Sequence, residues 1–315
     1  MKKTEKQNIT KKIPWLRYSW GDRIYLLIVY AFVILFGFAC LYPMYFTVIA
    51  SFSDTDAVYT GQTFWRVKGF NTYAYEGVFQ NSDIWRGYRN TIIYTVCGTL
   101  VNLALTIPTA YALSKKELPG RGFIMKLLMV TMYFGGGMIP TYIMYDKLGL
   151  VNNPMVMIIG GAVSVYNIIV TRTFFQNNIP DSLFEAARID GANEFYIFGR
   201  IALPLSGAIT AVMTLYYAVG HWNSYFSAMI YLKNPDTHPL QLVLRRILIQ
   251  NQSSLSAAAA GGLSDEAYAA LMQKQHLALG MKFSLVFIAS LPMLIIYPFV
   301  QKYFVKGVMV GSVKG

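Results

Sequence analysis

The sequence predicts an all-α membrane protein with six transmembrane helices and both termini in the cytoplasm, and three observations lead to this fold class. Only 13% of the 315 residues are charged and 55% are hydrophobic, whereas a soluble domain carries about 25% charged residues. Six long windows are strongly apolar and contain no charged residue. The basic residues flank these windows, so the net charge of +12 favours a role in membrane topology over nucleic-acid binding.

The charge-free windows define the predicted helices, because a charge at the bilayer centre costs roughly 2.5–3.5 kcal/mol. Each window is long enough to cross a hydrocarbon core about 30 Å thick. A seventh charge-free window, 247–264, is rejected because its middle reads NQSSLSAAAAGG, which is too polar and small for lipid. The charge-free windows are residues 24–53, 90–114, 127–145, 148–171, 201–232 and 283–301. The spans predicted around them are residues 24–50, 90–114, 124–145, 150–173, 203–232 and 282–304.

The distribution of Lys and Arg predicts the orientation of these spans. Seventeen of the 27 basic residues fall on one set of alternating segments, and we place that set in the cytoplasm. The N-terminal tail 1–23 precedes an apolar run that is too long for a signal peptide, so we expect a retained first span. The cytoplasmic set also includes the loop 178–202 and the tail 306–315, and the large loops 54–89 and 233–281 lie outside. Part of the second loop, SDEAYAALMQKQHLALGMK from Ser264, has the composition of an exposed helix.

The loop 178–202 contains a short charged stretch, EAARIDGA, between two apolar runs. Pro180 ends the preceding helix, and the spacing of Ser182 and Glu185 predicts a capping box that starts a new one. Gly191 permits a sharp turn before a second amphipathic piece, 193–200. These residues alone are also compatible with an ordinary amphipathic loop on lipid headgroups.

The stretch EAARIDGANEFYIFGRIALPL closely resembles the EAA loop of permease subunits of type I ATP-binding-cassette (ABC) importers. The stretch WNSYFSAMIYL and the tail QKYFVKGVMVGSVKG look like the carbohydrate-uptake, maltose-type subfamily, closest to its oligosaccharide and polysaccharide-fragment group. One departure is Gly207, which stands where the family commonly has a proline. The resemblance implies the transmembrane domain of such an importer in the bacterial cytoplasmic membrane.

The same resemblance implies that the loop couples ATP hydrolysis to movement of the helices. In the family the EAA helix docks in a groove of a cytoplasmic ATPase. From their apolar side chains alone, Phe184 and Phe195 are candidates for anchoring the loop in a partner's pocket. The implied partners are a second homologous permease, two ATPase subunits and an extracytoplasmic solute-binding protein. The implied coupling residues are Ser182, Glu185, Ala186, Ala187, Asp190, Gly191, Ala192 and Phe195.

Catalytic and cofactor-binding motifs are absent from the sequence. The dipeptide Gly-Lys never occurs, so there is no Walker A phosphate loop, and ATP and Mg²⁺ are expected to bind a separate ATPase chain. The three histidines are far apart in sequence, and Cys40 and Cys97 lie in apolar runs. We therefore expect a non-catalytic subunit with no metal or cofactor of its own.

Polar residues inside the predicted spans must find partners or face a cavity. His221, Trp222, Asn223 and Tyr225 combine aromatic and hydrogen-bonding groups and are candidates for lining a sugar pathway, with interhelical hydrogen bonding as the alternative. Asn102 and Asn167 raise the same choice. Gly135–Gly137 with Pro140, and Pro108, predict broken or kinked helices.

Three other functions compete with the sugar-importer interpretation. An ABC permease for a non-sugar solute has the same architecture. An ion-coupled secondary transporter usually shows more spans, inverted repeats and intramembrane charges, which this sequence lacks. A membrane enzyme would need a catalytic constellation, and none is found.

Overall fold

The computed structural model describes residues 19–247, 249 and 280–298. Within those ranges all regular secondary structure is helical. The predicted exposed helix after Ser264, the tail 306–315 and most of the tail 1–23 lie outside the described residues. The all-α prediction is confirmed for the part of the chain that is described.

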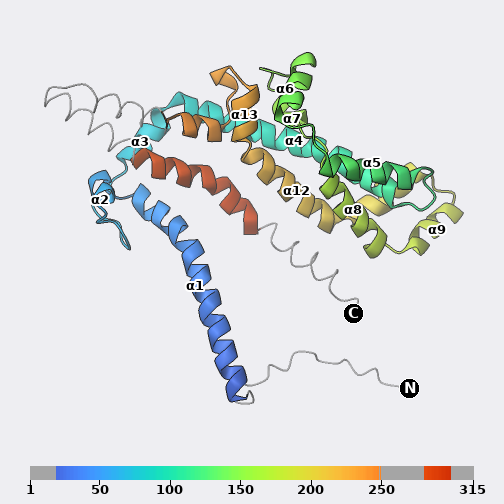
Figure 1. The fold of residues 1–315 in the computed structure, drawn as a ribbon, viewed down its shortest axis with the longest axis horizontal. Helices are drawn as coiled ribbons and strands as arrows, with labels where there is room; N and C mark the ends of the chain where they lie inside the picture. The colour runs from blue at the N-terminus through green and yellow to red at the C-terminus, as the bar shows by residue number, and fades with distance from the viewer. Residues whose placement is uncertain (1–18, 248, 250–279, 299–315) are drawn as a thin grey trace.

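Helix α1 (Trp20–Ser51) extends away from the other helices in Figure 1. It begins at Ser19, whose side chain accepts a hydrogen bond from the backbone N–H of Asp22. Its most apolar 18-residue window is not buried within this chain at all, and only the last turn, Ile49–Ser51, is buried. Almost the whole apolar surface of α1 is therefore available to a membrane or to another protein.

Helix α4 (Ser82–Ser114) is the central element and packs against α8 (Val165–Asn178) and α12 (Gly207–Trp222) (Figure 1). It follows α2 (Thr55–Tyr59) and α3 (Tyr73–Gln80). It begins eight residues before the predicted span, capped by Asn81, and it continues through Pro108 without a break. Seen along its length, α4 connects the end of the molecule near α3 to the end near α9 (Figure 1).

The third predicted span is divided into α5 (Arg121–Tyr133) and α6 (Met138–Lys147), which are bent by 113° relative to each other. The predicted break at Gly135–Gly137 is confirmed, and Gly137 has a positive φ of 84°. Such a φ is readily adopted by glycine because it has no Cβ. The three glycines therefore allow the chain to turn sharply between two apolar helices.

The fourth predicted span is not one continuous helix. A single turn, α7 (Val156–Ile159), is separated from α8 by an irregular stretch that contains Gly161 with a φ of 70°. Helix α8 starts where the Ser164 side chain accepts from the N–H of Asn167, and it runs beyond residue 173 to Asn178. The glycines of this stretch interrupt the helix, which apolar length alone did not reveal.

The segment from α9 to α13 is also interrupted. Helix α9 (Asp181–Ile189) is followed by α10 (Glu194–Ile197), a π-helical turn (Phe198–Ala202) and α11 (Leu203–Leu205). A bend of 78° then leads into α12. Beyond α12 come α13 (Tyr225–Tyr231), a 3-10 turn (Pro235–Thr237), a helical stretch at 240–247 and the C-terminal helix Gly280–Pro298.

Three helices of the described chain are long and apolar enough to cross a membrane, or up to five spans if each bent pair is counted as one. The three are α1, α4 and Gly280–Pro298; the pairs are α5 with α6, and Glu194–Leu205 with α12. The structure therefore has several apolar spans, while the count of six and the orientation stay predictions.

Different segments of the chain contact the two ends of α4. Its first turns contact Asp236, Thr237 and the 240–246 stretch, and its last turn contacts α8, α9 and α10 through a cluster of buried apolar residues. The segments predicted to be outside thus meet at one end of α4, and the segments predicted to be cytoplasmic meet at the other.

Candidate functional site

The predicted coupling loop folds as two short helices joined by a turn. Helix α9 ends at Ile189 with Asp190 as its C-cap. Gly191 follows with a φ of 80°, and the Gly191 N–H donates to the carbonyl of Arg188. This is the left-handed termination that glycine favours. The side chain of Asn193 then caps α10 by accepting from the N–H of Tyr196 at 2.8 Å. The predicted helix–glycine–helix shape is present.

The predicted capping box is wrong. Helix α9 begins at Asp181 with Pro180 in the N-cap position, and no side chain caps it. Pro180 holds an extended backbone, so the helix starts two residues earlier than the Ser182-x-x-Glu185 pattern requires, with Pro180 and not Ser182 as the N-cap. Ser182 consequently lies exposed in the first helical turn.

The two faces of α9 have different surroundings. Phe184 and Ala187, three residues apart on one face, are buried against the chain's own core. Exposed residues cover the rest of the helix, among them the predicted coupling residues Glu185, Ala186 and Asp190. Ala187 therefore packs inside this subunit, whereas Ala186 is open to a partner.

Two large apolar side chains near the turn are almost fully exposed in the described part of the chain. Phe195 is 90% exposed and Ile189 is 87% exposed. Gly191 is also exposed, and Ala192 is half-buried. Phe195 was predicted to be an anchor from the sequence, whereas Ile189 was not. The position of Ile189 between the charged residues Arg188 and Asp190 was the available signal.

The buried face of α9 rests on the end of α4. The ring of Phe184 packs against Tyr111, with ring centroids 6.0 Å apart, and the Lys115 ammonium lies 3.2 Å from the centre of the Phe184 ring. Lys115 Nζ is buried and has no hydrogen-bond partner among the described residues. Burial lowers the pKa of this lysine, the negative charge of Glu194 acts in the opposite direction, and the ammonium makes a cation–π contact with the Phe184 ring.

The last carbonyls of α4 are hydrogen-bonded by side chains from neighbouring segments. Arg172 Nε donates to the carbonyl of Leu113 at 2.9 Å, and Gln176 donates to that of Ser114 at 3.3 Å. Arg121 donates to the carbonyl of Lys115 at 3.2 Å. Cationic donors at a helix C-terminus satisfy its orphan acceptors and favour its dipole. The end of α4 is thus a well-defined platform under α9.

A cavity of about 370 Å³ lies between α4, α6, α7, α12 and α13. Its wall includes His221, whose Nε2 bonds the side-chain oxygen of Asn102 at 2.7 Å, while the Asn102 amide donates to the carbonyl of Ala162 at 2.7 Å. The lining is aromatic and hydroxyl-rich, a composition suited to stacking on sugar rings and bonding their hydroxyls. The lining residues are Asn102, Tyr145, Val156, Met157, Gly160, Gly161, Tyr216, Tyr217, Gly220, His221, Ser224, Ser227 and Tyr231.

Of the four predicted pathway residues, His221 lines this cavity and the other three lie elsewhere. Trp222 is buried and donates from Nε1 to the carbonyl of Ala289 on the C-terminal helix at 3.2 Å. Asn223 is exposed and bonds back to the carbonyl of Val219. The exposed ring of Tyr225 lies 5.5 Å from the Arg245 guanidinium. Asn167 is buried near the start of α8.

Most residues of the cavity wall were not among the candidates predicted from the sequence. The hydroxyl residues Ser224, Ser227 and Tyr231 recur at intervals of three and four along α13, which places them on one helix face. That spacing was the available signal. Tyr145 and Tyr216 come from other helices, and no local pattern connects them to the rest.

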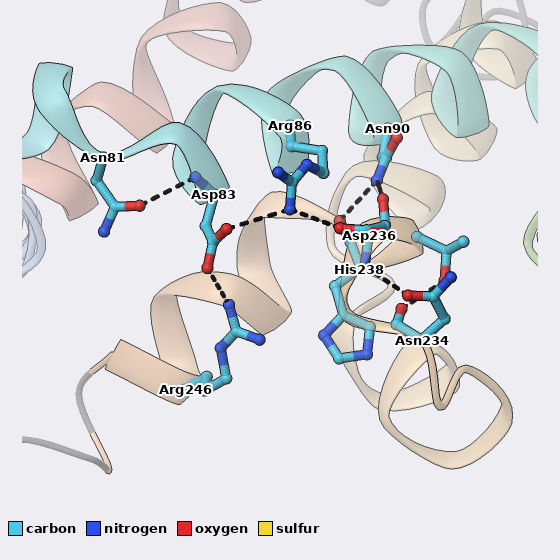
Figure 2. A network of polar contacts seen from close by, with 9 residues as sticks. Asn81, Asp83, Arg86, Asn90, Asn234, Asp236, His238 and Arg246 are labelled. Carbon is cyan, nitrogen blue, oxygen red and sulfur yellow. Dashed lines mark hydrogen bonds and ion pairs between the residues drawn. The ribbon is translucent and has the colours of Figure 1, made fainter.

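At the opposite end of α4 an ionic network joins its first turns to residues 234–246. Figure 2 shows Asp83 between Arg86 and Arg246, at 3.2 Å and 2.6 Å, and Arg86 reaching on to Asp236 at 2.6 Å. The Asn90 amide donates to the carbonyl of Asp236 at 2.7 Å. These contacts hold the start of the predicted outer loop on α4.

His238 lies beside this network (Figure 2). Both nitrogens of its ring are buried without a hydrogen-bond partner among the described residues. Burial lowers the pKa of His238, and the nearby Arg246 charge lowers it further. Its neutral form is therefore the one that suits the folded structure.

Residues 84–310 match the family described as the binding-protein-dependent transport system inner membrane component, which covers more than half of the chain. The chain belongs to this family. It is accordingly an inner-membrane permease subunit of a binding-protein-dependent ABC transport system. The fold of helices around α4 is the fold of such permeases.

Similar proteins are bacterial permeases. This permease is 36% identical over 294 residues to the polygalacturonan/rhamnogalacturonan transport system permease protein YtcP of Bacillus subtilis (strain 168), covering 93% of this chain and 99% of that protein. It is 39% identical over 279 residues to the protein LplC of the same organism, covering 89% and 91%.

A solved structure has the same fold. A chain in the crystal structure of a bacterial ABC transporter involved in the import of the acidic polysaccharide alginate superimposes with a TM-score of 0.81 at 33% identity. The match covers 91% of this permease and 99% of that chain.

Proposed function

We propose that this permease imports an oligosaccharide, with ATP hydrolysis supplied by separate ATPase subunits that dock on α9. The exposed face of α9 and the adjoining start of α10 carry the proposal, because Glu185, Ala186 and Ile189 of α9 and Phe195 of α10 are exposed in the described part of the chain. The sequence has no Walker A loop, so a partner must bind the ATP.

The sugar substrate is supported by two independent features. Two of the three named relatives carry a polysaccharide in their description: YtcP is named for polygalacturonan or rhamnogalacturonan transport, and the solved transporter is involved in the import of alginate. The cavity around His221 offers tyrosine rings and serine hydroxyls, the groups that bind sugars by stacking and hydrogen bonds.

The proposed assembly contains a second homologous permease, two cytoplasmic ATPases and an extracytoplasmic solute-binding protein. We propose six spans with both termini in the cytoplasm, an arrangement supported by the basic residues and by the separate clustering of loops at the two ends of α4. The loop 178–202 would then face the ATPases, and the network of Asp83 would face outward.

Replacement of Glu185 or Gly191 tests the coupling role of α9. We expect Glu185→Gln and Gly191→Ala to abolish oligosaccharide uptake in cells while the permease stays in the membrane at its normal level. Alanine at residue 191 strains a backbone with positive φ by about 1–2 kcal/mol, enough to change the angle between α9 and α10.

Matched controls separate coupling from general damage. Gly61 has a φ of 72° and open space around it, as Gly191 does, but lies near α2, and Glu76 is an exposed acid of α3. Gly61→Ala and Glu76→Gln should leave uptake unchanged. Normal uptake in both the Glu185 and the Gly191 variants would refute the coupling role.

A further inference from the structure

The side chain of Arg188 bridges the turn that separates the two short helices of the loop. Its Nε and Nη2 donate to the same carboxylate oxygen of Glu194, at 3.0 Å and 2.8 Å, across the turn at Gly191. Its Nη1 reaches Glu117, in the segment that follows α4, at 3.5 Å. One guanidinium therefore contacts α10 and the α4–α5 connection from its position on α9.

Glu194 carries this connection to α4 itself. Its second carboxylate oxygen accepts a hydrogen bond from the Tyr111 hydroxyl at 3.2 Å. Tyr111 is buried in the last turns of α4 and also packs against Phe184 of α9. Helix α9 is therefore linked to α4 in two ways. Arg188 of α9 binds Glu194, which accepts from Tyr111 of α4, and Phe184 of α9 packs directly on the Tyr111 ring.

The covalent route from α9 to the next long helix is irregular by comparison. After α10 the chain passes through the π-helical turn Phe198–Ala202 and then bends by 78° before α12. A displacement of α9 that depended on this route would have to pass through a bent, irregular segment. The contacts with α4 are direct, and α4 runs from the neighbourhood of α9 to the neighbourhood of α3 (Figure 1).

We propose that Arg188 is a positioning residue that joins α9, α10 and the cytoplasmic end of α4 into one rigid unit, so that movement of α9 is delivered to α4. This inference rests on the proposed function, because it assumes that an ATPase moves α9. Gly191 then sets a fixed angle and does not act as a free hinge. Through α4 the movement reaches Asn102 beside the cavity and Asp83 in the distant ionic network.

The decisive experiment measures oligosaccharide uptake and ATP hydrolysis together in proteoliposomes that contain the complete transporter and its binding protein. The variants are Arg188→Gln, Glu194→Gln and the double variant. Each single change should lower the amount of sugar taken up per ATP hydrolysed by about threefold or more. A change of this size corresponds to the interaction energies that double-mutant cycles find between residues in contact. The double variant should be no worse than the worse single one.

A second ion pair between the same elements provides the control. Lys116, beside the end of α4, pairs with Asp181 of α9 at 3.2 Å, but their side chains are 78% and 68% exposed. Such exposed pairs contribute little. Lys116→Gln should therefore leave the ratio of uptake to ATP hydrolysis at the wild-type value.

The outcomes separate the inference from the proposed function. A wild-type complex without ATP-dependent oligosaccharide uptake refutes the proposed function itself. If the wild type transports, a wild-type ratio in the single variants, or losses that multiply in the double variant, overturn the role of Arg188. If the Arg188→Gln permease does not assemble with the ATPases, the Glu194→Gln variant provides the test. A wild-type ratio of uptake to ATP hydrolysis in Glu194→Gln then overturns the role of Arg188.

Discussion

Gly98 on α4 lies directly beneath the imidazole ring of His221, and an alanine there should disturb the cavity wall. A Cβ at residue 98 would stand 2.8 Å from Nδ1 of the ring and closer still to two other ring atoms. Cβ atoms essentially never approach other atoms this closely, so the ring must shift. Moving it breaks the 2.7 Å hydrogen bond between His221 and Asn102.

The expected cost follows from two contributions. Loss of an interhelical hydrogen bond in a membrane protein costs about 0.6–1.7 kcal/mol. Overpacking costs about 1–3 kcal/mol, and the lower end applies here because the ring can swing into the adjacent cavity. We therefore expect Gly98→Ala to destabilise the permease by about 2 kcal/mol.

Thermal unfolding of the purified permease in detergent measures this effect, as a fall of roughly 2 °C or more in the midpoint for each kcal/mol. Gly37→Ala is the matched control, a helical glycine with open space around it, and should be neutral or slightly stabilising. In a double-mutant cycle, His221→Ala should remove most of the cost of Gly98→Ala. Additive effects of the two changes would refute the reasoning, since they would show that the ring is not what the new methyl group meets.

Two further predictions concern the network at the other end of α4. Asp83→Asn removes the charge partner of Arg246, whose side chain is only 28% exposed. Because the pair is neither fully exposed nor fully buried, the expected loss of unfolding free energy, about 1–2 kcal/mol, lies between the costs of breaking an exposed and a buried ion pair. A midpoint no lower than that of Lys116→Gln, which breaks an exposed pair, would contradict this expectation. For His238, burial lowers the pKa in the folded state, so the unfolded chain binds the proton first as the pH falls below about 6.5. Stability from this group is present above that pH and is lost on acidification. His238→Gln should make thermal stability less dependent on pH below about 6.5, and an unchanged pH profile would exclude this histidine as the cause.

The elements with strong local signals were predictable. The apolar windows identified α1, α4 and the C-terminal helix, because hydrocarbon excludes charge over a fixed length. Gly191 and Gly135–Gly137 predicted turns, since glycine readily adopts the backbone angles found there. The interruption after α7 and the start of α9 at Asp181 were not predicted correctly, because apolar length and a capping pattern do not decide where a helix breaks or begins.

At the candidate sites, local sequence patterns did not predict which side chains are buried and which line the cavity. Trp222 and His221 are neighbours in sequence, yet a step of one residue turns a helix by about 100°, so one ring meets the C-terminal helix and the other the cavity. Phe184 and Phe195 are both apolar members of one loop, but the first is buried and the second is 90% exposed.

The amino-acid sequence by itself determined that this chain enters a membrane, that a polar two-part loop follows α8, and which residues form the EAA pattern. These properties depend on composition and short-range spacing, which need no partner from elsewhere in the chain. Only the tertiary structure decided that Arg188, Glu194 and Tyr111 meet beneath α9, and that His221 bonds Asn102 beside a cavity. Their meeting depends on how helices far apart in the sequence pack against α4, because side-chain contacts are set by the distance between atoms and not by separation along the chain.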